Sequence, residues 1–187
     1  MFKLSLVDHL RLTFGHVIYT HRAHARLAAR HAAWNRWTQG LEGVFVLATA
    51  ASSAALAATG LLAYAIVAVV AGTAAAGVLL LRIVIDFDRR ASAHRACSAR
   101  LWHLHEQYRA LLADLRDGEL SIDDARERRD VLMDKVEAVY EDAPPAERAM
   151  YEAAHGSTSS THDGMLSDEE IDRFLPVSLQ KGGTSAA

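Results

Sequence analysis

The histidines are the residues whose type and spacing first suggest chemistry, because neutral imidazole binds transition metals at physiological pH. His21 and His24 stand three residues apart, and His31 lies seven beyond His24, so a helix would place all three on one face. Arginines interleave with them, and no carboxylate lies within two turns to complete a ligand set. We therefore expect a solvated, partly titrating face with His21 packed at its edge, and no metal or other cofactor.

Hydroxyl side chains form a second candidate site, within a long apolar stretch. Helical spacing brings four of them close to one face: Thr49, Ser52, Ser53 and Thr59. Further along the stretch, three small residues recur every four positions: Ala68, Gly72 and Ala76. Small residues let helix backbones approach closely in lipid, so the two faces are candidates for packing against each other, within a hairpin or between chains. Alternatively, the hydroxyl stripe lines an aqueous path in an oligomer, and residue spacing does not separate the two interpretations.

Patterns of catalytic residues are missing from the sequence. It has no phosphate-binding glycine loop, no Walker-type lysine and no Gly-x-Ser-x-Gly. The acidic stretch DGMLSDEEID lacks the calcium-loop pattern. His103 and His105 are two residues apart, which puts them on different helix faces. We therefore expect a protein that is not an enzyme.

A membrane-spanning hairpin is the element that would position the hydroxyl stripe. The 39 residues between Glu42 and Arg82 include no Asp, Glu, Lys, Arg or His. Because one crossing needs about 20 apolar residues, the stretch fits two spans, at about 41–59 and 61–82. Thr59-Gly60 is the expected turn, since glycine accepts the left-handed conformation that ends a helix. The alternative is a buried hairpin in a soluble all-α bundle, although a soluble helix normally shows a polar face.

The distribution of charge orients this hairpin. Residues 1–42 hold six Lys or Arg against two Asp or Glu, residues 82–116 hold seven against four, and residues 117–187 hold seven against 17. Every basic residue thus lies at or beyond the open ends of the hairpin, and none lies at its turn. This predicts a multi-pass membrane protein with both termini in the cytoplasm. Trp34 and Trp37 precede the first span, as interfacial aromatic residues do.

Amphipathic helices are predicted on both sides of the hairpin. Residues 1–40 form a cytosolic or interfacial helix with this apolar stripe: Val7, Leu10, Phe14, Val17, Ala25, Ala28 and Ala32. Residues 83–155 form a cytosolic helical region that contains a seam with alternating steps of four and three: Cys97, Leu101, Leu104, Tyr108, Leu111 and Leu115. Such a seam is typical of a packed helix pair or a short coiled coil, and it is the candidate assembly surface.

Local signals divide the rest of the chain. Asp117-Gly118 ends the seam helix, Ser121 caps the next helix, and prolines precede a further short helix over AERAMYEAA. Residues 156–187 are predicted to form a flexible tail with a short helix near 167–175, where Ser167 and Glu170 match a capping box. No strand-like alternation occurs. The sequence therefore predicts an all-α protein, in which the helices that flank a transmembrane hairpin form a cytosolic bundle.

This layout resembles the SLATT family, the two-transmembrane effectors found beside bacterial nucleotide-signalling proteins. The most family-like stretch runs from YRALLADLRDGELS to EDAPPAERAMYEAA, with a tyrosine-containing helix, a glycine turn, a capped helix, Ala-Pro and Tyr-Glu-Ala-Ala. The resemblance covers about residues 5–155. It implies an effector of anti-phage conflict systems that oligomerises and breaches the inner membrane in abortive infection, without any catalytic residue.

The resemblance also implies partners. No fused sensor domain is expected, so the trigger would come from a separate sensor or nucleotide second-messenger synthase encoded nearby, or from a ligand bound by the cytosolic helices. The lipid bilayer and further copies of the chain are expected partners, whereas nucleic acid is not. Two competing hypotheses are a membrane-anchored helical scaffold that forms no pore and a histidine-metal enzyme.

Overall fold

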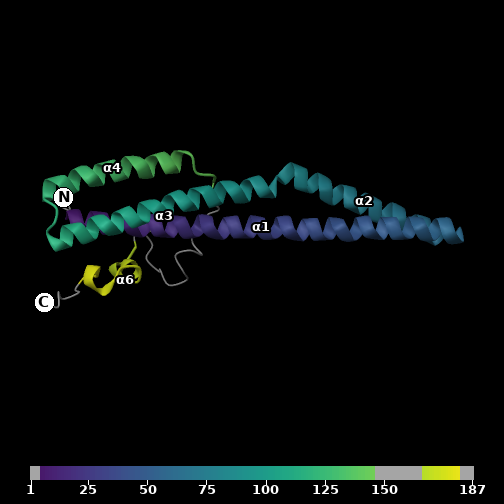
Figure 1. The fold of residues 1–187 in the computed structure, drawn as a ribbon, viewed down its shortest axis with the longest axis horizontal. Helices are drawn as coiled ribbons and strands as arrows, with labels where there is room; N and C mark the ends of the chain where they lie inside the picture. Colours follow the sequence, from purple (N-terminus) through teal and green to yellow (C-terminus); the bar gives the residue numbers. More distant parts are fainter. Residues whose placement is uncertain (1–4, 146–165, 182–187) are drawn as a thin grey trace. The chain divides into compact units, whose positions relative to one another are not determined.

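Helices joined by short turns make up the residues that the computed structural model describes, 5–145 and 166–181 (Figure 1). Its elements are α1 (Leu6–Thr59), α2 (Leu62–Ile85), α3 (Phe87–Asp117), α4 (Ile122–Glu141), α6 (Asp168–Asp172) and the 3-10 helix η1 (Val177–Leu179). No strand occurs among these described residues, so the predicted all-α fold class is confirmed. The predicted helix over AERAMYEAA and the predicted linker after it lie outside the described residues.

Residues with positive φ separate the long helices. Gly60 (φ 68°) follows α1 at the residue where the turn is expected, and Gly118 (φ 72°) follows α3. Asp86 (φ 49°) is the one non-glycine residue of this kind in the described part of the chain. Its backbone N–H donates to the carbonyl of Arg82 at 2.9 Å, which closes α2, and its Oδ1 accepts from the backbone N–H of Arg89 at 3.2 Å, which caps α3. One aspartate thus joins two helices, with a short side chain that tolerates this backbone.

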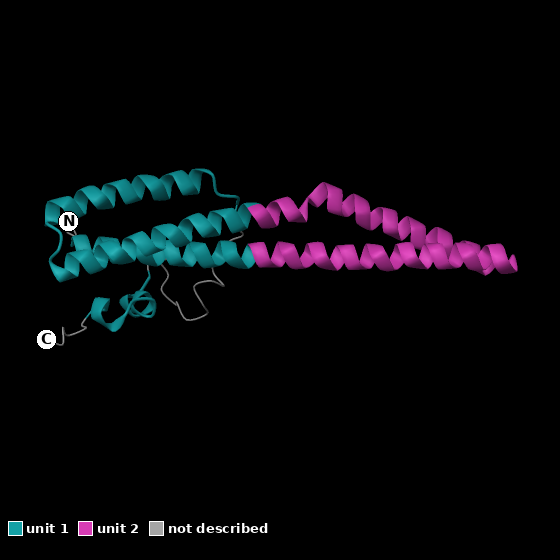
Figure 2. Cartoon of the chain, in the orientation of Figure 1, with its two compact units in different colours: residues 1–27, 93–187 teal, residues 28–92 magenta. Residues whose placement is uncertain are grey.

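The helices belong to two compact units (Figure 2). Residues 28–92, here called the hairpin unit, contain the second part of α1, all of α2 and the start of α3. Residues 1–27 and 93–187, here called the core unit, contain the start of α1, the rest of α3, α4 and the C-terminal elements.

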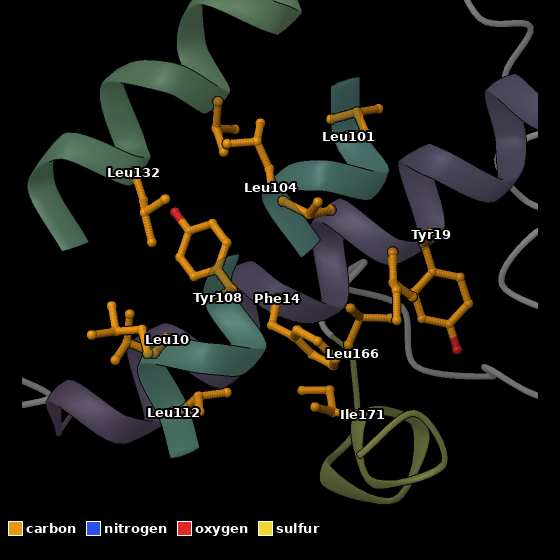
Figure 3. Packing of buried hydrophobic residues seen from close by; sticks show 14 of the residues in the cluster. Leu10, Phe14, Tyr19, Leu101, Leu104, Tyr108, Leu112, Leu132, Leu166 and Ile171 are labelled. Carbon is orange, nitrogen blue, oxygen red and sulfur yellow. The ribbon is translucent and has the colours of Figure 1, made fainter. Parts of the chain in front are cut away.

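The predicted seam of α3 lies at the centre of the core unit (Figure 3). Five of its six residues are at most 5% exposed, and the sixth, Leu115, is partly buried. The same hydrophobic cluster includes residues of α1 and α4: Leu10, Phe14, Val17, Ala125, Leu132 and Val136. The seam is therefore covered by helices of its own chain, which makes it the core of one subunit in this structure.

The C-terminal segment, residues 166–181, differs from the expected flexible tail. Its capping box forms as predicted between Ser167 and Glu170, but Leu166 and Ile171 are only 6% and 1% exposed and join the core cluster. The physical reason is Gly15 of α1. A Cβ on Gly15 would stand 2.7 Å from Cδ1 of Leu166, so the missing side chain provides the space into which the segment packs.

The buried face of α1 also differs in part from the predicted stripe. Several predicted residues are buried: Leu10, Phe14, Val17 and Ala28. Val7 is 44% exposed, however, and Ala25 is exposed, whereas His24 is only 2% exposed. Repeated steps of four, as in 17–21–25, drift around a helix, while alternating steps of four and three, as in 17–21–24–28, stay on one face. The buried face follows the second pattern.

Candidate functional site

The outer surface of the hairpin unit is apolar and uncovered. Two helices of the described chain are long and apolar enough to cross a membrane, and only 6% of the apolar window of each is buried. Large exposed side chains include Val44, Leu47, Ile66, Val69, Val70 and Leu80. The core helix of a soluble protein would have such residues covered, and contiguous apolar patches of this kind mark surfaces that contact lipid or other proteins. The hairpin unit is thus suited to a bilayer.

The two helices of the hairpin unit meet through small residues. A methyl group placed on Gly72 would lie 3.7 Å from both Cγ2 and Oγ1 of Thr49, so the backbone of α2 lies against this threonine. Ser52 on α1 and Ala71 and Ala75 on α2 are buried as well. Small side chains allow this close approach, as in other helix pairs in lipid.

The structure divides the hydroxyl stripe between two surroundings. Thr49 and Ser52 lie partly or fully buried toward α2, whereas Ser53 and Thr59 are exposed. The hydroxyls of Thr49 and Thr59 donate to carbonyls one turn earlier on α1, each at 2.8 Å. The small-residue repeat is divided too, because Ala76 is exposed while Ala68 and Gly72 are partly buried. In the single chain, the four hydroxyl residues therefore do not share one exposed face.

Charged groups meet where the apolar stretch ends. Arg82 of α2 donates to Glu42 of α1 through an ion pair whose side chains are 25% and 21% exposed. Trp34 and Trp37, nearer the start of the hairpin unit, are 53% and 77% exposed. With Arg30 they line a shallow apolar groove on α1. Exposed tryptophan beside arginine is typical of the membrane–water interface.

Two histidines pair inside the core unit. His24 of α1 and His94 of α3 are 2% and 4% exposed, and their Nδ1 atoms lie 2.9 Å apart. One ring must donate and the other accept, so the accepting imidazole is neutral in this arrangement. Burial lowers the pKa of His24, which agrees with a neutral ring. The expectation of a solvated histidine face is therefore wrong for His24, because the face that carries it packs against α3.

The other histidines are distributed over separate contacts. Nδ1 of His21 lies 2.9 Å from the carbonyl oxygen and 3.0 Å from the hydroxyl of Ser98. His31 lies beside the ring of Phe87, with ring centroids 6.3 Å apart. His105 is 4% exposed, and burial lowers its pKa. Among the residues that the structure describes, no three side chains of His, Cys, Asp or Glu gather closely enough to hold a metal ion.

A comparison with known protein families matches most of the described helices. The model of a family described as SMODS and SLOG-associating 2TM effector domain family 4 matches residues 6–170. The match includes both helices of the hairpin unit and reaches into the C-terminal segment, beyond residue 155 where the resemblance noted from the sequence ends. No curated protein and no solved structure matches the chain.

Proposed function

The chain belongs to the SMODS and SLOG-associating 2TM effector domain family 4, and on this premise we propose that it oligomerises in the bacterial inner membrane as a gated pore or membrane-disrupting effector. Family membership makes it a membrane effector of conflict systems. The finer proposal is that its activity ends the life of an infected cell in anti-phage defence. A separate sensor or nucleotide second-messenger synthase would supply the trigger, and the effector itself would act without catalysis.

The observation that supports this proposal best is the uncovered hairpin unit. Its exposed apolar side chains need lipid or other hairpins around them, because exposure of a large apolar surface to water is unfavourable. Ser53 and Thr59 are the members of the hydroxyl stripe that are exposed within one chain. In an assembly of hairpins, these exposed hydroxyls are the ones available to line an aqueous path. Thr49 and Ser52 would then serve as packing residues.

A second candidate function, an anchored scaffold without a pore, is favoured by one specific observation. The Thr59 hydroxyl already donates to the carbonyl of Ala55, so it needs no water and is compatible with lipid. A scaffold would use the hairpin unit only as an anchor for the core unit.

Dye release from liposomes that contain the purified protein separates the two functions. A pore-forming effector should release dye, and the double change Ser53→Leu with Thr59→Leu should lower release several-fold, because bulky apolar groups narrow and dry a path. The matched control is Ala50→Leu with Ala57→Leu, at two positions that are also exposed. No release from the parent protein under any trigger would favour the scaffold. Equal loss in both double variants would show that Ser53 and Thr59 are not the lining residues.

A further inference from the structure

A stripe on α1, outside the hairpin unit, holds the C-terminal segment. The stripe, here called the docking stripe, consists of Arg11, Gly15, Tyr19 and Arg22. Their spacing of four, four and three places them on one helix face. The C-terminal segment comprises α6 and η1 with the residues around them, and it contacts this stripe along its length.

Arg11 supplies the polar part of the docking stripe. This residue is only 3% exposed, and it forms an ion pair with Asp172. Its Nη1 donates to the carbonyl of Leu179 at 2.6 Å, and its Nη2 lies 3.8 Å from a carboxylate oxygen of Asp168. A buried guanidinium is tolerated only when it is paired and hydrogen-bonded. The carboxylates and the carbonyl that contact the Nη atoms of Arg11 come from the C-terminal segment.

The apolar part of the stripe complements the same segment. Gly15 leaves room for Leu166 and Ile171, which approach the position of its absent Cβ to 2.7 Å and 3.1 Å. Phe174 packs edge-on against Tyr19, with ring centroids 5.6 Å apart at 89°. The guanidinium carbon of Arg22 lies 4.3 Å from the centroid of the Phe174 ring, in a cation–π contact.

The C-terminal segment is also bonded within itself. The side-chain amide of Gln180 donates to the carbonyls of Asp172 and Leu175, each at 3.0 Å. Nζ of Lys181 lies 2.8 Å from a carboxylate oxygen of Asp168. Helices as short as α6 are unstable alone in water. The segment therefore depends on the docking stripe for its order, but its internal bonds allow it to leave and bind as one unit.

We propose that the docking stripe takes the C-terminal segment of a second copy of this chain, so that neighbouring subunits exchange these segments when they assemble. The proposal rests on the assembly part of the proposed function. Exchange preserves every contact described above, which makes it a low-cost route to association. Residues 146–165 connect α4 to the segment, and a chain of that length spans at most about 70 Å. Packed helices lie about 8–10 Å apart, so the stripe of an adjacent subunit is within reach.

The negative charges of the C-terminal segment complement the positive charges of the docking stripe. Four carboxylates lie within or beside the first turn of α6: Asp168, Glu169, Glu170 and Asp172. The stripe offers two guanidinium groups, those of Arg11 and Arg22. A second copy of the chain presents the same complementary charges, with the apolar residues in the same register.

Two charge-reversal variants, one in the docking stripe and one in the C-terminal segment, test the exchange. Arg11→Glu sets a carboxylate against Asp172, and Asp172→Arg sets a guanidinium against Arg11, so neither variant can dock its segment on a chain of its own kind. Co-expressed, the two full-length chains can dock on each other, because each carries the half that the other lacks. The single chain that carries both changes restores a charge pair within itself and is the matched control. The measurement is hydrogen exchange of backbone amides in residues 166–181, with α3 as the internal reference.

We expect each variant alone to exchange about tenfold faster in residues 166–181, as when a buried ion pair loses one partner, while α3 stays protected. Co-expression should restore protection. If the doubly changed chain is protected but the co-expressed pair is not, docking occurs only within a chain and the proposal is overturned. It is also overturned if single variants keep the segment protected, if α3 loses protection with it, or if the doubly changed chain stays unprotected.

Liposome leakage is independent of this readout. Restored protection without leakage would contradict the pore and support segment exchange. Leakage without restored protection would support the pore and contradict segment exchange.

Discussion

Glu42 and Arg82, the first charged residues on either side of the apolar stretch, form an ion pair within the hairpin unit. They stand 40 residues apart in the sequence, yet their side chains meet and are only 21% and 25% exposed. The pair therefore fixes how α1 and α2 are aligned at the open end of the hairpin. It also marks the point along α1 and α2 where apolar side chains are replaced by charged ones.

Removal of either partner should destabilise the hairpin, and removal of both should cost less than the sum. Glu42→Ala, Arg82→Ala and the double variant form a double-mutant cycle, and we expect a coupling energy of about 1 kcal/mol, within the range for residues in direct contact. Denaturant unfolding in detergent micelles would measure it. Additive single effects would show that the pair contributes nothing measurable.

Gly72 should resist a large side chain more than Gly77 does. A Cβ on Gly72 would already touch Thr49, whereas a Cβ on Gly77 would meet nothing within 4 Å. Gly72→Leu should therefore lower the stability of the hairpin by about 1–3 kcal/mol, as overpacking does. Gly77→Leu should change it little. Thermal unfolding in detergent compares the two, and equal effects would contradict the close contact between α1 and α2.

Leu104 should be needed for folding of the core unit. It is 4% exposed at the centre of the α3 seam, so Leu104→Ala should cost about 2–5 kcal/mol. Leu104→Asp should cost more, because it buries an unpaired carboxylate. Met133→Asp on α4 is the matched control, since Met133 is 42% exposed. Circular dichroism and hydrogen exchange of α3 and α4 would report the loss, and a stable Leu104→Asp protein would refute burial of the seam.

The core unit should lose stability as the pH falls. Burial lowers the pKa of His24 and of His105, so the folded state holds both rings neutral at a pH where the unfolded chain, with histidine pKa near 6.5, already takes up protons. The stability is fully present above about pH 6.5 and declines as the pH falls through the lowered folded pKa values. Thermal unfolding at several pH values would measure the decline.

His24→Gln should make that decline shallower, because it removes one of the two groups. The test holds buffer, detergent and ionic strength constant while the pH alone changes. A parent protein with a flat profile below pH 6.5, or one that becomes more stable there, would contradict the lowered pKa values of His24 and His105.

Both termini should lie in the cytoplasm, with only the turn at Gly60 outside. All the basic residues lie at or beyond the open end of the hairpin, and cytoplasmic flanks attract them. Fusions of a periplasm-active enzyme and of a cytoplasm-active fluorescent protein to each terminus would report the side. Ends on opposite sides of the membrane would rule out the two-span arrangement, and a periplasmic signal from both ends would contradict the predicted orientation.

Periodicity and capping explain why much of the fold was predictable. The seam of α3, the cap at Ser121 and the turn at Gly60 depend on residues that are close in sequence. The pair of His24 and His94 was missed although the same alternation points to it. His94 stands three residues before Cys97, and His24 stands seven after Val17, so both continue apolar seams. A histidine on such a face is a buried residue when another ring is there to accept or donate its hydrogen bond.

Long-range contacts were out of reach of such patterns. Arg11 and Asp172 are 161 residues apart, and no local spacing links them. The hydroxyl stripe shows a different limit. At 100° per residue, positions 49, 52, 53 and 59 spread over roughly 120° of the helix circumference. A face that broad is divided by a single packed neighbour, which covers Thr49 and Ser52 and leaves the others exposed.

The position of Cys97 makes the native chain ready for site-specific labelling. It is the sole cysteine, only 5% of it is exposed, and burial raises the pKa of its thiol, so little reactive thiolate forms at neutral pH. A cysteine introduced on the exposed surface of the hairpin would therefore react with a maleimide or a spin label ahead of Cys97, without prior removal of the native thiol. Probe by probe, such labels would map water access and subunit spacing in a protein whose core had not been altered.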